Sequence, residues 1–384
     1  MDRKGGTMST VSLRAVGDNL LHEQVFKAAK MEDGSYCFDG EFEHIASLIK
    51  GADISVINQE TIYVKDRTDI SSFPFFGSPM EAGDAIRRAG FDLVTHASNH
   101  ALDKGFKAIR ETVDYWNKAD GDVVFTGIHD NTEDADKIRI LERNGLKIAF
   151  LNYTGPMNYH IVPPNHPHCV DVMNVFSKGR IKSQIKRAKQ EADIVAVFPH
   201  WGCEYLYEPI PKQIKWAHFF ADAGADIIIG THPHVLQYKD TIRSEDGRDV
   251  PCFYSLGNFI ACQVIQGTML GGMADVVMSI KNGRVIVEKA DIIPLVIHTD
   301  RNYSFFTSYP LKDYNDELAS VNRIFAVMKE RNGWNVNMEY LNKLFEDIMN
   351  RRAMEYSIYK SPRQVRAQNI RGVIRILSGK KTKK

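Results

Sequence analysis

The sequence predicts an α/β fold with mixed β-sheets. Four apolar runs lack the polar alternation of half-exposed strands, which predicts strands buried on both faces: 54–57, 93–95, 194–198 and 227–229. Helix-like segments separate these runs along the chain, as expected where helices connect parallel strands. Two Asn-Gly pairs between apolar-rich segments predict antiparallel hairpins. The sheets are therefore expected to be mixed rather than purely parallel.

The predicted elements follow one another in a regular order. Helices are expected at 41–51, 79–90, 104–118, 177–193 and 211–224. The second of these has proline near its start and glycine at its end, the usual asymmetry of a helix, and Ser177 is the predicted N-cap of the fourth. The hairpins pair 138–144 with 146–153 and 274–281 with 284–290. Beyond residue 311 the strands stop, and helices are expected at 314–332 and 337–353.

We therefore expect a domain at 1–310 and a helical extension at 311–384 that ends in a basic tail. The tail contains one apolar helical stripe among basic residues, formed by Ile370, Val373, Ile374 and Leu377. Such a helix suits peripheral contact with an anionic membrane or with an anionic polymer. The alternative is that the stripe docks on the protein core, which the pattern slightly favours.

Composition limits the classes of function. The 384 residues are 43% hydrophobic and 25% charged, which is typical of a globular protein with a sizeable core. A net charge of +1 and the lack of nucleic-acid-binding motifs argue against a nucleic-acid partner. Five cysteines without a CxxC pair favour a reducing compartment. Arg14 and Gly17 interrupt the first apolar stretch, so it predicts neither a signal peptide nor a membrane span, and a cytoplasmic location is expected.

Side chains that can bind metal or transfer protons follow the predicted strands. The clearest case is the run Ile227-Ile228-Ile229-Gly230, after which come His232 and His234. The other residues of this kind at or after strand ends are Asp18, Asn58, Glu60, Asn99, His100, His200, Glu204 and Asn258. In open sheets, ligands gather beyond the ends of strands. Carboxylate, amide and imidazole groups together suit a hard or borderline divalent cation.

Several of these residues also have a purely structural explanation. The alternatives are a helix cap for Asp18 and Asn99, an exposed loop for Glu60, and a core position for His200. Their shared place after strands favours one common site. Two cations about 3.5–4 Å apart would lower the pKa of a bridging water, and Glu60 or Asp18 would supply the bridging carboxylate. Nitrogen and oxygen ligands leave Mn²⁺, Fe and Zn²⁺ open as the metal.

A proton donor is expected beside this site. His100 directly follows Asn99 and can protonate a leaving group. Asp103 stands three residues further on, so it can orient or charge that imidazole if a helical turn follows.

These stretches resemble the CapA-type capsule, or poly-γ-glutamate, biosynthesis proteins of the calcineurin-like metallophosphoesterase superfamily. The matching stretches are AVGD at 15–18, NQET at 58–61, SNHALDKG at 98–105, HWGCEY at 200–205, GADIIIGTHPH at 224–234 and YSLGNF at 254–259. All six occur in the family's order, and the resemblance covers about residues 11–300.

The resemblance implies a four-layer sandwich in which two central sheets are flanked by helices. It also implies two cations, the first held by Asp18, Glu60 and His234 and the second by Glu60, Asn99, His200 and His232. His100 would protonate the leaving group, and Glu204 would be a ligand or would orient His200. Asn58 and Asn258 are candidates for orienting residues or further ligands.

Two positions depart from the pattern of the wider superfamily. Leu20 stands where that pattern has a metal-binding histidine, and Ala101 stands where it has an aspartate, with Asp103 as a displaced substitute. His22 is a candidate for the gap at Leu20, but the pattern favours a place for it on a helix face. The loop 161–169, which carries His166 and His168, is expected to be a mobile surface loop, with substrate contact as the alternative.

Two functions follow from these expectations. The first is a CapA-type hydrolase that uses a metal-bound hydroxide on a phosphoester or an amide, with an anionic polymer, a small phosphoester or a peptide as substrate. The second is a non-catalytic metal-binding component of a polymer or surface-glycan assembly system, which the gap at Leu20 favours. The sequence predicts no oligomeric state.

Overall fold

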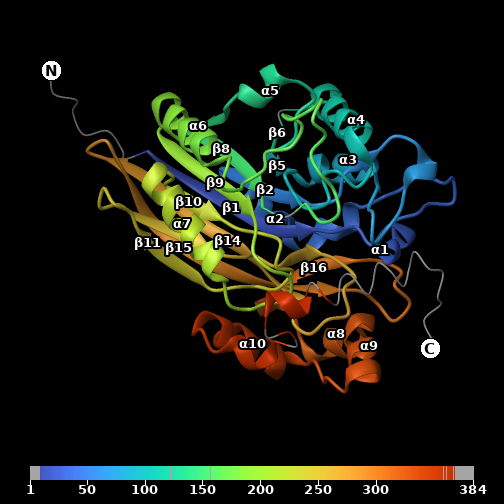
Figure 1. The fold of residues 1–384 in the computed structure, drawn as a ribbon. Helices are drawn as coiled ribbons and strands as arrows, with labels where there is room; N and C mark the ends of the chain where they lie inside the picture. Colours follow the sequence, from blue (N-terminus) through green and yellow to red (C-terminus); the bar gives the residue numbers. More distant parts are fainter. Residues whose placement is uncertain are drawn as a thin grey trace.

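The computed structural model describes residues 9–121, 123–155, 157–357, 359, 361–365 and 367. Within these residues, two β-sheets pack face to face and helices cover the outer side of each, so the chain forms four layers (Figure 1). The expected α/β fold and its four-layer arrangement are confirmed. The apolar stripe expected in the basic tail lies outside the described residues.

The first sheet contains eight strands among the described residues, in the order β16-β15-β14-β1-β2-β5-β6, with β13 paired to β1. Their bounds are β1 Thr10–Asn19, β2 Ile54–Gln59, β5 Leu93–Thr95, β6 Val124–Thr126, β13 Asn258–Ile260, β14 Leu270–Lys281, β15 Arg284–His298 and β16 Thr307–Pro310. The strands from β1 to β6 run parallel, whereas β14, β15 and β16 are antiparallel neighbours. This sheet is therefore mixed, as predicted.

The second sheet contains six strands within the described part of the chain, in the order β11-β12-β10-β9-β8-β7. Their bounds are β7 Arg139–Arg143, β8 Leu146–Thr154, β9 Ile194–His200, β10 Ile227–Ile229, β11 Lys239–Arg243 and β12 Asp249–Phe253. Both predicted Asn-Gly hairpins are present, as β7–β8 in this sheet and β14–β15 in the first. Two short strands, β3 Tyr63–Val64 and β4 Ser78–Pro79, pair separately.

Apolar side chains from both sheets fill the space between them. Leu13 of β1, Phe150 of β8 and Ile227 of β10 belong to this shared core and are fully buried. Burying such a side chain stabilises the fold by about 1.5–3 kcal/mol. That burial, together with pairing to β9 and β12, explains how a strand as short as β10 is held in the sheet centre.

Helices pack on the outer face of each sheet. Helices α3 (Glu81–Ala89) and α4 (Gly105–Lys118) cover the first sheet, and α6 (Lys178–Glu191) and α7 (Pro211–Ala223) cover the second. All four were predicted to within a few residues. Shorter helices are α1 Glu23–Ala28, α2 Ala46–Lys50 and α5 Thr132–Asp136, and the 3₁₀ helices are η1 Asp39–Ile45, η2 Arg67–Asp69, η3 Leu311–Asp313 and η4 Ala353–Tyr356.

The predicted single helix at 41–51 is wrong, because η1 and α2 divide this segment. Phe42 and Ile45 are both buried and stand three residues apart. A 3₁₀ helix has three residues per turn and places two such side chains on one face. The tighter helix therefore suits the packing of this segment against β16.

The predicted helix at 314–332 is also divided, into α8 (Asp316–Val321) and α9 (Arg323–Asn332). Buried Asn322 causes the break. Its side chain donates to the carbonyl oxygen of Ile297 and accepts from the backbone amide of Ile324, and its backbone is extended. The last helix, α10 (Met338–Met349), agrees with the predicted segment 337–353. Apolar residues of these helices join the core of the first sheet. The domain boundary at residue 310 stays a prediction.

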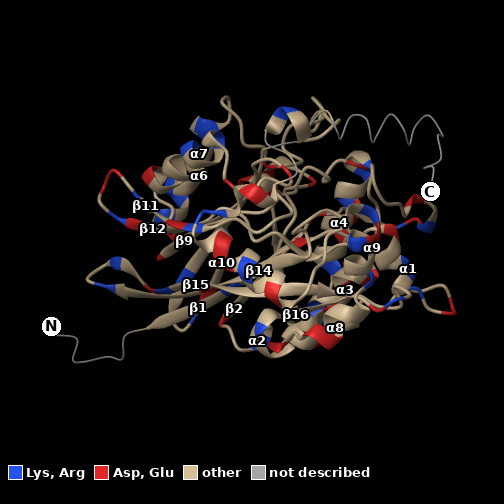
Figure 2. Cartoon of the chain, turned by 90° about the horizontal axis from the view of Figure 1, so that it is seen from below, with Lys and Arg blue, Asp and Glu red and all other residues tan. Residues whose placement is uncertain are grey.

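Charged residues of both signs are spread over the molecule. Figure 2 shows Lys and Arg beside Asp and Glu on most of the elements it labels, in line with the net charge of +1. Among the described residues, every helix is too short or too polar to cross a bilayer.

Candidate metal centre

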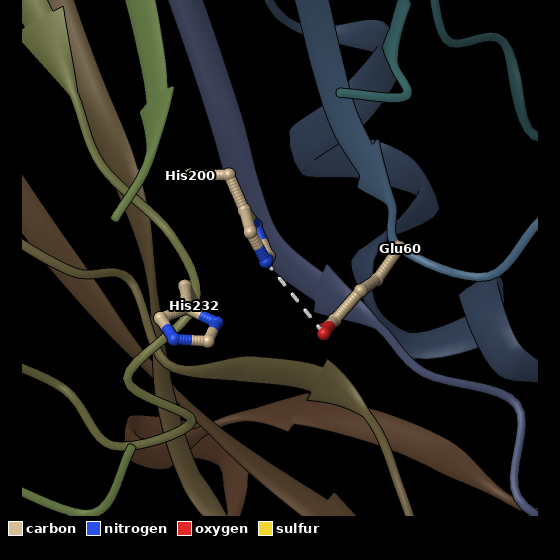
Figure 3. Close-up of side chains that lie close together, drawn as sticks. All are labelled: Glu60, His200 and His232. Atoms are coloured by element: carbon tan, nitrogen blue, oxygen red, sulfur yellow. Dashed lines mark ion pairs between the residues drawn. The ribbon is translucent and has the colours of Figure 1, made fainter. Parts of the chain in front are cut away.

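The predicted metal ligands come together at one edge of the two sheets. Asp18 lies near the end of β1, Glu60 follows β2, and Asn99 follows β5, all in the first sheet. His200 ends β9, while His232 and His234 follow β10, both in the second sheet. Figure 3 shows Glu60, His200 and His232 pointing towards one another. All six predicted ligands are at most 4% exposed.

The side chains form two groups that share one carboxylate. Asp18, Glu60 and His234 each place a potential ligand atom within 4.8 Å of the others, and so do Glu60, His200 and His232. Asn99 adjoins the second group, because its Oδ1 lies 2.6 Å from His200 Nε2. This grouping corresponds to the two ligand sets that the resemblance implied, with Glu60 common to both.

Several polar atoms at this place have no hydrogen-bond partner. Both carboxylate oxygens of Glu60, Nδ1 of His232 and Nδ2 of Asn99 are buried and unpaired. A buried polar group without a partner costs about 1–3 kcal/mol, and more if it is charged. The unpaired carboxylate oxygens of Glu60 and the imidazole nitrogen of His232 therefore fit a bound cation, which would satisfy them, whereas the amide nitrogen of Asn99 is a donor and needs an acceptor.

The pKa values of these groups also reflect an excess of buried charge. Burial raises the pKa of the Glu60 carboxyl to about 8; His234 opposes this rise and Asp18 adds to it. Burial lowers the pKa of His234, but the carboxylates of Glu60 and Asp18 outweigh burial and raise it to about 10. Burial and neighbouring imidazoles hold the pKa of His200 and of His232 well below the usual range. A divalent cation would supply the positive charge that protons otherwise provide here.

The backbone is strained where it delivers the histidines. His232, His234 and Tyr205 have φ angles of 98°, 59° and 63°, in a region that residues other than glycine rarely adopt. Such strain is typical of functional sites that the surrounding structure holds in place. Nearby, a Cβ atom on Gly17 would lie 1.9 Å from the carbonyl oxygen of Gly257, so glycine is required where β1 approaches β13.

Asn58, Asn258 and Glu204 have different places around these groups. Asn58 donates to Asp18 Oδ1 over 2.8 Å and so orients that carboxylate. Asn258 Oδ1 accepts from His234 Nδ1 over 3.0 Å. Both asparagines therefore contact a predicted ligand in the manner of orienting residues. Glu204 is partly exposed and belongs to neither group of candidate ligands among the described residues.

His100 and Asp103 form a hydrogen-bonded pair beside the two groups. His100 Nδ1 lies 2.6 Å from Asp103 Oδ2, which also accepts from the backbone amide of Phe76 over 2.7 Å. His100 Nε2 faces Glu60 at 3.9 Å. Burial lowers the pKa of His100, but Asp103 outweighs it and the pKa is raised. Asp103 thus favours the protonated imidazole that a proton donor needs.

His160 also contacts this pair, and the sequence did not indicate it. Its Nε2 lies 3.2 Å from Asp103 Oδ1. It belongs to the loop between β8 and α6. In that loop the sequence indicated His166 and His168 instead. His166 stacks on Phe106 with ring centroids 3.7 Å apart, and among the described residues it belongs to neither ligand group. No local motif marks His160, because its contact depends on how the loop folds over Asp103.

The position of Leu20 provides no ligand. Its side chain is buried in the core, and its backbone amide donates to Ile260. The expected helix-face position of His22 is wrong, because His22 precedes α1 and its Nδ1 accepts from the backbone amide of Cys262 over 3.2 Å. Burial and the nearby His234 lower the pKa of His22 to about 3. Among the described residues, His22 belongs to neither ligand group.

Comparison with known proteins gives consistent matches. The family model of the bacterial capsule synthesis protein PGA_cap matches residues 12–263. The capsule biosynthesis protein CapA of Bacillus anthracis is 30% identical over 75% of this chain and 67% of that protein. The PGA biosynthesis protein CapA of Bacillus subtilis (strain 168) is 29% identical over 65% of this chain and 63% of that protein. The chain thus spans about two thirds of the length of these curated relatives.

Solved structures with a related arrangement were also found. The calcineurin-like phosphoesterase YfkN from Bacillus subtilis has a TM-score of 0.44 at 14% identity, over 88% of this chain and 100% of that one. A hypothetical protein from Thermus thermophilus has a TM-score of 0.43 at 16% identity, over 74% of this chain and 99% of that one.

Proposed function

The chain belongs to the PGA_cap family of bacterial capsule synthesis proteins, and from this premise we propose that it is a divalent-metal-dependent hydrolase. Its substrate would contain a phosphoester or an amide, in an anionic polymer of the capsule or poly-γ-glutamate type, in a small phosphoester or in a peptide. The observation that supports this most is Glu60, a buried carboxylate without a hydrogen-bond partner that belongs to both groups of candidate ligands.

The residues divide into metal ligands and a proton donor. Asp18, Glu60 and His234 would hold one ion of Mn, Fe or Zn, and Glu60, Asn99, His200 and His232 would hold the other. When bound, such cations acidify water and neutralise negative charge on the reacting group.

His100 would give its proton to the leaving group. It faces the same centre, and the hydrogen bond from its Nδ1 to Asp103 leaves Nε2 free to act. Asp103 is held in turn by the amide of Phe76, which fixes the orientation of the imidazole, and His160 Nε2 lies 3.2 Å from its other carboxylate oxygen.

Metal content tests the proposal most directly. We expect one to two equivalents of Mn, Fe or Zn in protein purified without chelator, and a clear reduction in His232→Ala, because His232 Nδ1 is an unpaired ligand candidate. His218→Ala is the matched control, since His218 is exposed on α7. Elemental analysis measures both. Absence of metal from the wild type after reconstitution, or equal content in His232→Ala, would contradict the proposal.

A non-catalytic metal-binding component of a polymer assembly system is the second candidate. The observation that favours it is Leu20, a buried apolar side chain where the wider pattern has a ligand. The two candidates differ at His100, because a binding protein tolerates His100→Asn and a hydrolase does not.

For location we propose the cytoplasm, with peripheral membrane contact through the basic tail as the alternative.

A further inference from the structure

A series of hydrogen bonds leads from His234 towards the C-terminal segment. His234 Nδ1 lies 3.0 Å from Asn258 Oδ1, and Asn258 Nδ2 lies 2.8 Å from Gln263 Oε1. Gln263 Nε2 then lies 3.2 Å from the hydroxyl of Tyr205. The sequence predicted His234 and Asn258 of this series as site residues, but neither Gln263 nor Tyr205.

One backbone group fixes the direction of these hydrogen bonds. Asn258 Nδ2 also lies 3.1 Å from the carbonyl oxygen of Thr268, which can only accept. Asn258 must therefore turn its nitrogen to Thr268 and its Oδ1 to His234. In the neutral imidazole that binds a metal, His234 therefore carries its proton on Nδ1, and its Nε2, which lies 3.8 Å from Glu60 Oε1, would present a lone pair to the metal centre.

Asp18 supports the same tautomer of His234. Its Oδ2 lies 3.3 Å from His234 Nδ1 and is a second acceptor there. Because both neighbours of Nδ1 are oxygen acceptors, the proton of the neutral imidazole belongs on Nδ1. The asparagine then determines how the ring is turned.

Gln263 continues the series with one fixed orientation. Since its Oε1 accepts from Asn258, its Nε2 must donate to the Tyr205 hydroxyl. Tyr205 has a left-handed backbone, and its amide donates to the carbonyl oxygen of Pro233 over 2.7 Å. Tyr205 therefore contacts the strained histidine segment through its backbone and Gln263 through its side chain.

The C-terminal segment packs on Tyr205. Ser357 Oγ donates to the Tyr205 carbonyl oxygen over 3.2 Å, and the ring of Tyr359 lies 5.9 Å from that of Tyr205. Buried Val365 joins a small apolar cluster with Cys203 and Leu206. These three C-terminal residues lie beyond the segment 12–263 that the family model matches.

We propose that Gln263 and Tyr205 are positioning residues that keep His234 turned with Nε2 towards a cation, and that Ser357, Tyr359 and Val365 hold Tyr205 in place. This inference rests on the proposed function, because it concerns the same metal centre. Hydrogen-bond partners of metal-binding histidines typically change metal affinity by about 10- to 100-fold.

The test is titration of metal-free, full-length protein with Co²⁺, whose visible absorption depends on the number and geometry of its ligands. Gln263→Leu removes both side-chain hydrogen bonds and is expected to weaken one of two bound ions by about 10- to 100-fold. Tyr205→Phe removes one hydroxyl and should cause a smaller change in the same direction. Gln263→Glu should restore binding, because a carboxylate accepts from Asn258 and from a reoriented Tyr205 hydroxyl.

Tyr153→Phe is the matched control. Tyr153 belongs to β8, and its hydroxyl donates to Gln184 of α6 over 3.1 Å, outside this series of hydrogen bonds. Unchanged Co²⁺ affinity and absorption in Gln263→Leu would overturn the positioning role while leaving the proposed function intact. Failure of the wild type to bind Co²⁺ would overturn both. If Gln263→Leu does not fold, Tyr205→Phe is the deciding variant. Weaker Co²⁺ binding in Tyr205→Phe would support the positioning role, and unchanged binding would overturn it.

Discussion

Three residues beside the metal centre have a backbone conformation that is unfavourable for any residue with a Cβ atom. His232, His234 and Tyr205 are left-handed, which costs about 1–2 kcal/mol for each residue that has a Cβ atom. Hydrogen bonds to Asp18, Asn258 and Pro233 accompany this strain. Despite this cost, both imidazoles face the same centre, one in each group of candidate ligands.

The pair formed by His100 and Asp103 leads to a prediction about leaving groups. His100→Asn should slow hydrolysis by about 10²- to 10⁴-fold for a poor leaving group that needs a proton. The loss should be much smaller for a nitrophenyl leaving group, which departs as a stable anion. Metal content should stay at the wild-type value, because His100 lies outside both ligand groups. Steady-state rates on the two substrate types measure the difference.

The control for that prediction is His166→Asn, a loop histidine that stacks on Phe106. It should leave both rates unchanged. Equal losses of rate with both leaving groups in His100→Asn would contradict the role as proton donor. Full activity in that variant would favour the non-catalytic candidate.

The site residues that the sequence predicted are those that lie at or directly after the end of a strand. Within each sheet, three of the six predicted ligands converge because parallel strands end at the same edge. His160, Tyr205 and Gln263 were missed because loops bring them to the site, and loop conformation leaves no periodic pattern in the sequence. The metal binding of the ligands and the catalytic role of His100 stay predictions.

Prediction of the elements succeeded for a related physical reason. Continuous apolar runs and Asn-Gly turns are local signals, and β2, β5, β9, β10 and both hairpins agree with them. The segments that differ depend on distant contacts instead. Asn322 interrupts a helix, and its side chain donates a hydrogen bond to the carbonyl oxygen of Ile297 in β15. Phe42 and Ile45 favour a 3₁₀ helix that packs against β16. Neither partner is visible within a short window of sequence.

A buried histidine connects the elements at the side of the second sheet. His129 lies 2.8 Å from Asp171 and 3.1 Å from Asp134 of α5, and these carboxylates also pair with Arg180 of α6 and Arg139 of β7. Burial lowers the pKa of His129, but Asp171 and Asp134 outweigh it and raise the pKa to about 9. Charged His129 thus stabilises the junction between these elements.

Because the pKa of His129 is higher in the folded protein than its usual 6.5, its stabilising effect is complete below about pH 6.5 and disappears as pH rises through about 9. We expect His129→Gln to lower the free energy of unfolding at about pH 6 by up to about 3 kcal/mol. The difference from wild type should shrink by about pH 10. Urea unfolding at both pH values measures it, with exposed His218→Gln as control. A difference that is constant with pH would disprove the role of charged His129.

The metal centre depends on the packing of the whole molecule. The first sheet supplies Asp18, Glu60 and Asn99, whereas the second supplies His200, His232 and His234. Neither sheet alone brings together an acid and two imidazoles. The apolar core between the sheets therefore sets the distances between the two halves of the site. The C-terminal residues Ser357 and Tyr359 also pack on Tyr205 beside this site.

This arrangement predicts that metal binding stabilises the fold. A cation that binds the folded state alone stabilises it by about 2.7 kcal/mol at a hundredfold excess over Kd, which raises Tm by several degrees. Glu60→Gln should abolish this rise, because Glu60 is shared by both ligand groups. It should not lower Tm of the metal-free protein, since the wild-type carboxyl is buried there without a hydrogen-bond partner. Calorimetry with chelator and with Mn²⁺ measures both effects. A metal-induced rise of equal size in Glu60→Gln would show that the cation binds elsewhere.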